Sequence, residues 1–137
     1  AGDAAPGLVV FQQPEIGLYQ RLVESARHLW KRRRNWQVLL ASIVEAELYH
    51  GAEKYTLSDQ RRELLTDFLA LYHRIPFDSR CVAHYAKISH HLEIRGEIIG
   101  GNDLLIAATA LPHGLTLITH NGGEFARVPG LQWEDWA

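Results

Sequence analysis

The chain has 137 residues, of which 47% are hydrophobic and 22% are charged, a composition typical of one globular domain that needs no disulfide or metal to support its core. Its net charge of -2 excludes a surface that holds nucleic acid through overall positive charge and leaves only local patches for that purpose. The single cysteine, Cys81, excludes an internal disulfide and favours the cytoplasm, and no apolar run predicts a membrane span or a signal peptide.

Short apolar runs alternate with amphipathic segments along the chain. Residues 8–11 are an apolar run that ends before Gln12 and Pro14, which predicts a buried strand followed by a helix. Further strands are expected over 36–41, 72–77, 115–119 and 131–135, and helices over 15–34, 42–51, 59–71, 79–95 and 102–110, with a short helical turn at 124–125. We expect residues 1–137 to form one domain, with residues 1–6 disordered or added in cloning.

This alternation of strands and helices predicts an α/β fold. Parallel sheets need helices on their faces, so we expect three layers, with a mostly parallel sheet of four or five strands between helices. In the helix over 59–71, four apolar residues are expected to point inward: Leu64, Leu65, Phe68 and Leu71. Pro76 indicates that the strand around it lies near an edge of the sheet.

Local signals predict where several helices begin and end. Ser42 and Glu45 fit a capping box, in which each side chain bonds a free backbone amide, and Gly51 is expected to end that helix. Asp78 or Ser79 is expected to cap the helix over 79–95, and the glycine at 96 to end it. Glu47, two residues after Glu45, has no cap to make and is therefore available for another role.

Residues 100–110 predict a tight turn that opens into an apolar helix. Gly100 and Gly101 permit a tight entry, and Asn102 is expected to be the N-cap. The helix is apolar on most of its circumference and is therefore expected to be buried. Asp103, in its first turn, has an ordinary explanation, because a carboxylate there complements the helix dipole; other polar residues at the same edge of the sheet favour a functional one.

Four such residues follow or lie near the carboxyl ends of the expected strands: Gln12, Glu47, Asp103 and Asn121. Ligands of parallel sheets bind at this edge. Carboxylates that converge from separate segments repel one another unless a positive ion lies between them. An oxygen-only site suits Mg²⁺ or Mn²⁺, and such an ion can activate water to hydrolyse a phosphodiester. The pattern therefore favours a nuclease site.

Several motifs occur in unbroken order over residues 37–137: SIVEAELYHGA at 42–52, IPFD at 75–78, IGGNDLLIAA at 99–108, LITHN at 117–121, EF at 124–125, VPGL at 128–131, and Trp136. Together they resemble the PIN-domain ribonucleases and, among these, the VapC-like toxins of bacterial toxin-antitoxin systems. The resemblance implies an endoribonuclease that depends on Mg²⁺ or Mn²⁺. It also implies a homodimer held inactive by a cognate antitoxin, whose tail enters the active-site groove.

The same resemblance implies roles for individual residues. Glu47 and Asp103 match the second and third acids of the family and are implied as metal ligands and catalytic residues. Asn121, after Thr119, matches the last position of the site. Glu124 either assists through a water molecule or forms a capping box with Asn121, and the sequence leaves both readings open.

The chain departs from the family pattern at the end of the first strand. Family members carry an aspartate there that binds the metal, whereas this chain has Gln12 at that point. Glu15, one turn into the following helix, could substitute for it. Because a glutamine carbonyl is a neutral and poorer ligand for a hard cation, the alternative is a PIN-like protein that binds antitoxin or RNA without cleaving.

Overall fold

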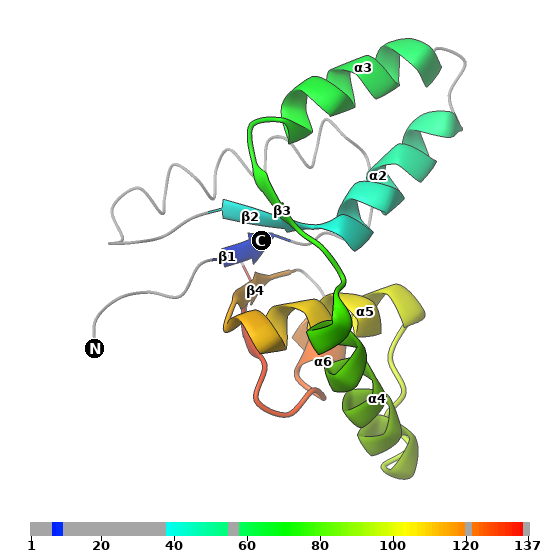
Figure 1. Cartoon of the computed structure of the whole chain (residues 1–137). Helices are drawn as coiled ribbons and strands as arrows, with labels where there is room; N and C mark the ends of the chain where they lie inside the picture. The colour runs from blue at the N-terminus through cyan, green and yellow to red at the C-terminus, as the bar shows by residue number, and fades with distance from the viewer. Residues whose placement is uncertain (1–6, 10–37, 55–57, 120–121, 136–137) are drawn as a thin grey trace.

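The computed structural model describes residues 7–9, 38–54, 58–119 and 122–135. The elements in these ranges are β1 (Gly7–Val9), β2 (Val38–Ala41), α2 (Ser42–Glu53), α3 (Ser58–Leu69), β3 (His73–Ile75), α4 (Ser79–Ile94), α5 (Gly101–Ala110), the 3-10 turn η1 (Leu111–His113), β4 (Thr116–Ile118), α6 (Gly122–Phe125) and β5 (Gln132–Glu134) (Figure 1). The expected helix over 15–34 and residues 1–6 lie outside the described residues. Within the described part of the chain, no helix is long and apolar enough to cross a membrane.

The strands form one parallel sheet in the order β3-β2-β1-β4-β5. At the centre, Leu8 of β1 is in register with Leu39 on one side and with Leu117 on the other. Leu117 is fully buried, and Leu39 is nearly so. The expected edge position of the strand before Pro76 is confirmed, because β3 is an outer strand. The α/β class and the parallel sheet predicted from the sequence are therefore both observed.

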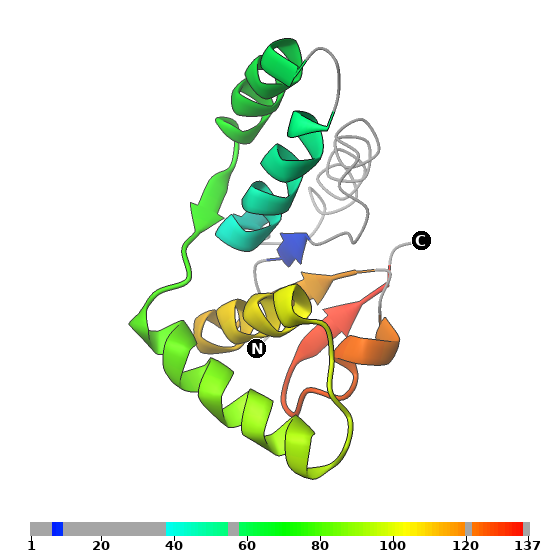
Figure 2. The same cartoon turned by 90° about the vertical axis from the view of Figure 1, so that its right-hand side faces the viewer.

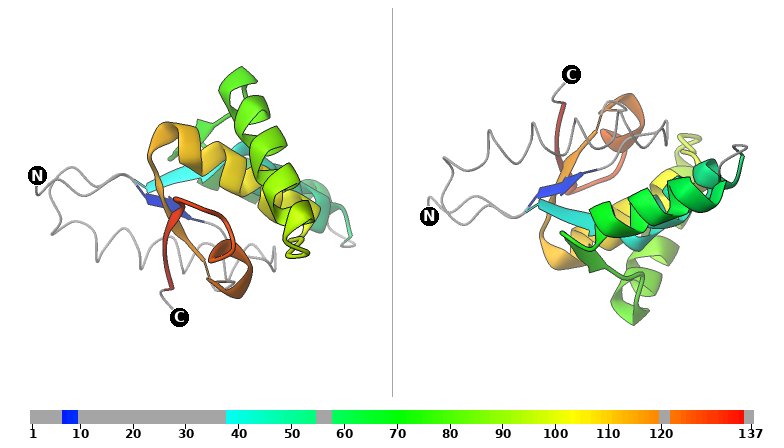
Figure 3. Two further views of the ribbon diagram at one scale, coloured as in Figure 1. Left: turned by 90° about the horizontal axis from the view of Figure 1, so that it is seen from below. Right: turned by 90° about the horizontal axis from the view of Figure 1, so that it is seen from above.

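The helices pack in two pairs. The helices α4 and α5 contact each other and lie on one side of β4 and β5 (Figure 2). The helices α2 and α3 run alongside each other at the end of β2, as the view from above shows (Figure 3). Contacts between α2 and α5 join the two pairs. Ser42, which follows β2, and Gly101, which begins α5, are thereby brought to the same end of the molecule (Figure 1).

The inward face of α3 differs from the expected one by a small rotation. Leu65, Phe68 and Leu69 are buried, which is the i, i+3, i+4 stripe of one helix face. The prediction was wrong for Leu64 and Leu71, whose exposed fractions are 62% and 71%. Leu64 precedes the buried stripe by one position, which turns it away from the core, and Leu71 lies beyond the last residue of α3.

The expected capping box at the start of α2 is wrong. The N-cap is Ala41, and no side chain bonds the free amides there. Glu45 instead forms an ion pair with Arg74, with 3.1 Å between Glu45 Oε2 and Arg74 Nε. The end of the helix also differs, because α2 continues through Gly51 to Glu53. Glu45 therefore contacts Arg74 of the neighbouring strand β3 instead of the backbone at the start of its own helix.

The predicted ends of α4 are confirmed, whereas the predicted start of α5 is not. Asp78 caps α4 by accepting hydrogen bonds from the amides of Arg80 and Cys81. Hydrogen bonding to Cys81, first through its side chain and then through its amide, lowers the pKa of Asp78. Gly96 follows the helix with a φ of 64°, a left-handed conformation that favours glycine. The N-cap of α5 is Gly100 rather than Asn102, so Asn102 lies inside the first turn of the helix.

Candidate active site

Asp103 is held in the first turn of a buried helix. The helix α5 starts with a hydrogen bond from the amide of Leu104 to the carbonyl of Gly100, at 2.9 Å. Ile106, Ala107 and the residues after them are fully buried between α4 and β4, as the apolar sequence predicts. This packing fixes the position of the helix start, and it leaves Asp103 only 7% exposed.

A second carboxylate, that of Glu124 on α6, reaches the same place. A Cβ atom on Gly100 would lie 3.6 Å from Asp103 Oδ2 and 3.9 Å from Glu124 Oε2. The adjacent Phe125 is fully buried and anchors α6. Two carboxylates from separate elements therefore converge beside Gly100, and the absence of a side chain on this glycine leaves room next to both of them.

Thr119 lies at the end of β4, where sequence analysis placed the last motif of the site. It is fully buried, and its amide donates a hydrogen bond to the carbonyl of Glu134 at 3.0 Å. The bond to Glu134, the last residue of β5, fixes the end of β4. The expected site residues Gln12, Glu15 and Asn121 lie outside the described residues, so their part in the site stays a prediction.

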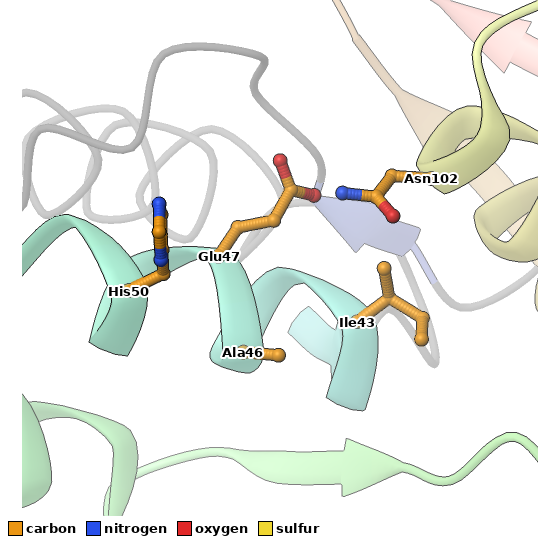
Figure 4. Close-up of a pocket in the computed structure, with 5 residues that line it drawn as sticks. All are labelled: Ile43, Ala46, Glu47, His50 and Asn102. Atoms are coloured by element: carbon orange, nitrogen blue, oxygen red, sulfur yellow. The ribbon is translucent and has the colours of Figure 1, made fainter.

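Glu47 faces α5 from the helix α2. It lines a pocket of about 280 Å³ together with Ile43, Ala46, His50 and Asn102. Its carboxylate points toward the side chain of Asn102, the residue before Asp103 (Figure 4). Burial raises the pKa of Glu47 above its ordinary value of 4.5. The structure thus brings Glu47 opposite the start of α5, at the same end of the sheet as Asp103.

The donor atoms of this region are those that a hard cation prefers. Asp103, Glu124 and Glu47 offer carboxylate oxygens, which suit Mg²⁺ or Mn²⁺ rather than zinc or copper. Among the described residues, no three or more histidine, cysteine, aspartate or glutamate side chains form a single group that could hold a metal. The described part of the site is therefore a pair of carboxylates beside Gly100 and a third carboxylate in the adjoining pocket.

Sequence reasoning missed two residues of this region. Asn102 was interpreted as a cap, yet its side chain is exposed and lines the pocket. His50 was noted only as part of a motif, although it follows Glu47 by one helical turn and so shares its face of α2. The i, i+3 spacing from Glu47 was the signal that could have identified His50.

Comparison with known proteins identifies the family and two relatives. Residues 20–131 match the family model described as PIN domain. The chain is 40% identical over 103 residues to ribonuclease VapC2 of Rickettsia felis, covering 75% of this chain and 77% of that protein. It is 37% identical over 100 residues to ribonuclease VapC2 of Haemophilus influenzae, covering 73% and 76%.

Among solved structures, the chain is similar to the crystal structure of VapBC2 from Rickettsia felis bound to a DNA fragment from their promoter. The TM-score is 0.81 and the sequence identity 33%, and the match covers 96% of this chain and 99% of that one.

Proposed function

Since the chain belongs to the PIN-domain family, in which its relatives are VapC ribonucleases, we propose that it is an endoribonuclease of the VapC toxin type. It hydrolyses phosphodiester bonds of RNA and is inhibited by a cognate antitoxin protein. The observation that carries this proposal is the convergence of Asp103 and Glu124 beside Gly100, with Glu47 of α2 facing Asn102 at the start of α5 (Figure 4). Carboxylates gathered at the carboxyl ends of parallel strands are suited to metal-assisted hydrolysis.

A divalent cation, Mg²⁺ or Mn²⁺, is part of this proposal. Asp103 and Glu47 would hold it, Asn121 would orient it or its water, and Gln12 or Glu15 would complete the set of ligands. When bound, the cation lowers the pKa of water and offsets the negative charge of the phosphate in hydrolysis. The carboxylate oxygens of Asp103 and Glu47 support this choice of ion.

The protein's own side chains have distinct tasks in this scheme. Asp103 is nearly inaccessible to solvent, so its carboxylate keeps a fixed direction relative to the start of α5. Glu47 loses part of its hydration in the pocket, which is why its pKa is raised, and a nearby positive charge would offset that cost. Glu124 lies close enough to Gly100 to act through water in the same space, which favours the site role over a purely capping one.

The partners follow from the family. The similar Rickettsia felis structure contains VapBC2. By analogy, we propose that a cognate antitoxin covers the active site of this chain. The protein acts as a homodimer in the cytoplasm, where its RNA substrate and its antitoxin are present.

The proposal is tested by digestion of a pool of total bacterial RNA with the purified chain. We expect cleavage with Mg²⁺ or Mn²⁺ and none when a chelator replaces the ion. Cleavage that continues in chelator would contradict the metal-dependent mechanism. RNA binding without cleavage under any ion would contradict the enzyme and support the non-cleaving alternative that Gln12 raises.

A further inference from the structure

The pocket beside Glu47 has a lining that the metal site does not explain. Ile43 and Ala46 provide apolar surface, and His50 and Asn102 provide polar groups at its sides. We infer that this pocket binds one unpaired base of the RNA substrate, next to the bond that is cleaved. This inference rests on the proposed function, because it assigns a substrate subsite to the same active site.

The size and the apolar lining of the pocket favour a base over a phosphate. Its volume of about 280 Å³ is below the roughly 300–1,000 Å³ of pockets for drug-sized ligands, so it suits a single ring system. A phosphate in the pocket would lie against the apolar side chains of Ile43 and Ala46, which offer it no hydrogen bond and cost it hydration. A base is uncharged and has flat apolar faces, so contact with Ile43 and Ala46 costs it little hydration.

His50 supplies a stacking surface. It is exposed, and its ring projects from the same face of α2 as the Glu47 carboxylate (Figure 4). Unpaired RNA bases are commonly bound by stacking on aromatic rings, histidine included. A base stacked on His50 lies beside Glu47, which places its neighbouring phosphate near the carboxylates of the site.

Asn102 supplies a group that can read the edge of the base. It comes from α5, on the opposite side of the pocket from His50 (Figure 4). Its amide carries both a donor and an acceptor, the two groups needed to distinguish bases by hydrogen bonds to their edges. The pocket is therefore a determinant of which sequence is cleaved, in addition to its part in binding RNA.

The test uses a pool of total bacterial RNA and random short RNAs, with Mn²⁺, and maps the bases around each cut. His50→Ala should lose the base preference at one position beside the cut and raise KM by about tenfold, since stacking on one base has roughly that value. The rate constant kcat should change little, and His50→Phe should restore both preference and KM. Asn102→Ala should broaden the preference at the same position.

Two comparisons sharpen this test. An abasic nucleotide at the preferred position should slow cleavage by the wild type and have no further effect on His50→Ala. The matched control is His90→Ala, which removes an exposed histidine of α4 that does not line the pocket, and it should behave as wild type.

The outcomes separate this inference from the proposed function. An unchanged preference and KM in His50→Ala, with cleavage intact, would overturn the base subsite alone. Restoration by His50→Gln but not by His50→Phe would also overturn it, because the contact would then be polar rather than stacked. A wild-type chain that cuts no RNA in the pool would contradict the proposed function, and the subsite with it.

Discussion

The indole ring of Trp133 packs directly against the backbone of Gly122. A Cβ atom at Gly122 would lie closer to Trp133 Cζ3 than such atoms approach in real structures. Gly122 begins α6, and Trp133 lies in β5. The ring thereby fixes the short helix that carries Glu124, so the last strand of the sheet helps to position a residue of the candidate site.

This contact predicts that Gly122→Ala destabilises the protein. The added methyl group must displace the ring or shift α6, and we expect a loss of about 1–3 kcal/mol, typical of overpacking. Gly123→Ala is the matched control, because its Cβ would meet nothing within 4 Å. Urea unfolding of both variants measures the difference, and equal stabilities would show that Trp133 does not constrain α6.

A second prediction concerns the space beside Gly100. Alanine there places a methyl group in ordinary contact with the Asp103 and Glu124 oxygens, and the backbone angles of Gly100, φ -57° and ψ 147°, suit any residue. The fold should therefore survive, while a hydrated ion loses room. We expect the dissociation constant for Mn²⁺ to rise by about tenfold, as for other changes that disturb metal ligands indirectly.

Calorimetric titration of Mn²⁺ into the Gly100→Ala protein gives this constant. Gly101→Ala is the control, since a Cβ at that position would have no neighbour within 4 Å, and it should bind Mn²⁺ as the wild type does. Equal affinity in the two variants would place the ion away from Gly100.

Glu47 yields a prediction about stability and pH. Burial raises its pKa in the folded protein above the ordinary value of 4.5, so the folded state binds this proton more tightly than the unfolded state. The contribution of Glu47 to the free energy of unfolding is therefore greatest below pH 4.5, where the carboxyl is protonated in both states. This contribution falls as pH rises through the pKa of the folded state.

Glu47→Gln cannot ionise, so it avoids the loss of stability that the wild type undergoes when this carboxyl is deprotonated. The variant should therefore be more stable than wild type at neutral pH when both are in chelator. We expect a gain below about 1 kcal/mol, because the half-buried carboxylate keeps part of its hydration. Thermal melts at several pH values measure the gain, which should grow from acid to neutral pH. A gain that shrinks with rising pH would contradict the raised pKa.

A fourth prediction follows from the ion pair that replaced the expected capping box. Ser42→Ala should change stability by less than about 0.5 kcal/mol, since Ser42 makes no cap hydrogen bond. Arg74→Ala should cost more, about 1 kcal/mol, because it removes both the pair with Glu45 and a hydrogen bond from Arg74 Nη1 to the Leu69 carbonyl. Chemical unfolding of the two variants measures both losses. A larger loss of stability in Ser42→Ala than in Arg74→Ala would contradict this account and indicate that Ser42 caps α2.

The fold was predictable where the pattern depends on neighbours in the chain. The apolar run of α5, the strand β4 and the cap of α4 by Asp78 all follow from local sequence, and the structure has them. Glu45 behaves differently because its partner, Arg74, lies on another strand, and spacing within one helix cannot reveal that contact. The orientation of α3 was also uncertain, because Leu64 and Leu65 are adjacent and only packing decides which of them is buried.

The candidate site divides in the same way. Glu47 and Asp103 were identifiable from motifs, whereas the convergence of Asp103 and Glu124 depends on how α6 packs, which no motif describes. The pocket formed by His50 and Asn102 requires that α2 and α5 face each other. Its lining comes from segments far apart in the sequence, so its existence could be learned only from the folded chain.

The central claim is that Asp103 serves an RNA-cleaving site, and it is tested most directly by single-turnover cleavage of RNA by Asp103→Asn in Mn²⁺. The change keeps the size of the side chain and removes its charge. The control is Asp67→Asn, which alters an exposed aspartate of α3. We predict that Asp103→Asn lowers the cleavage rate by about 100-fold or more, while Asp67→Asn cleaves as wild type does. Equal rates for Asp103→Asn and wild type would contradict the account.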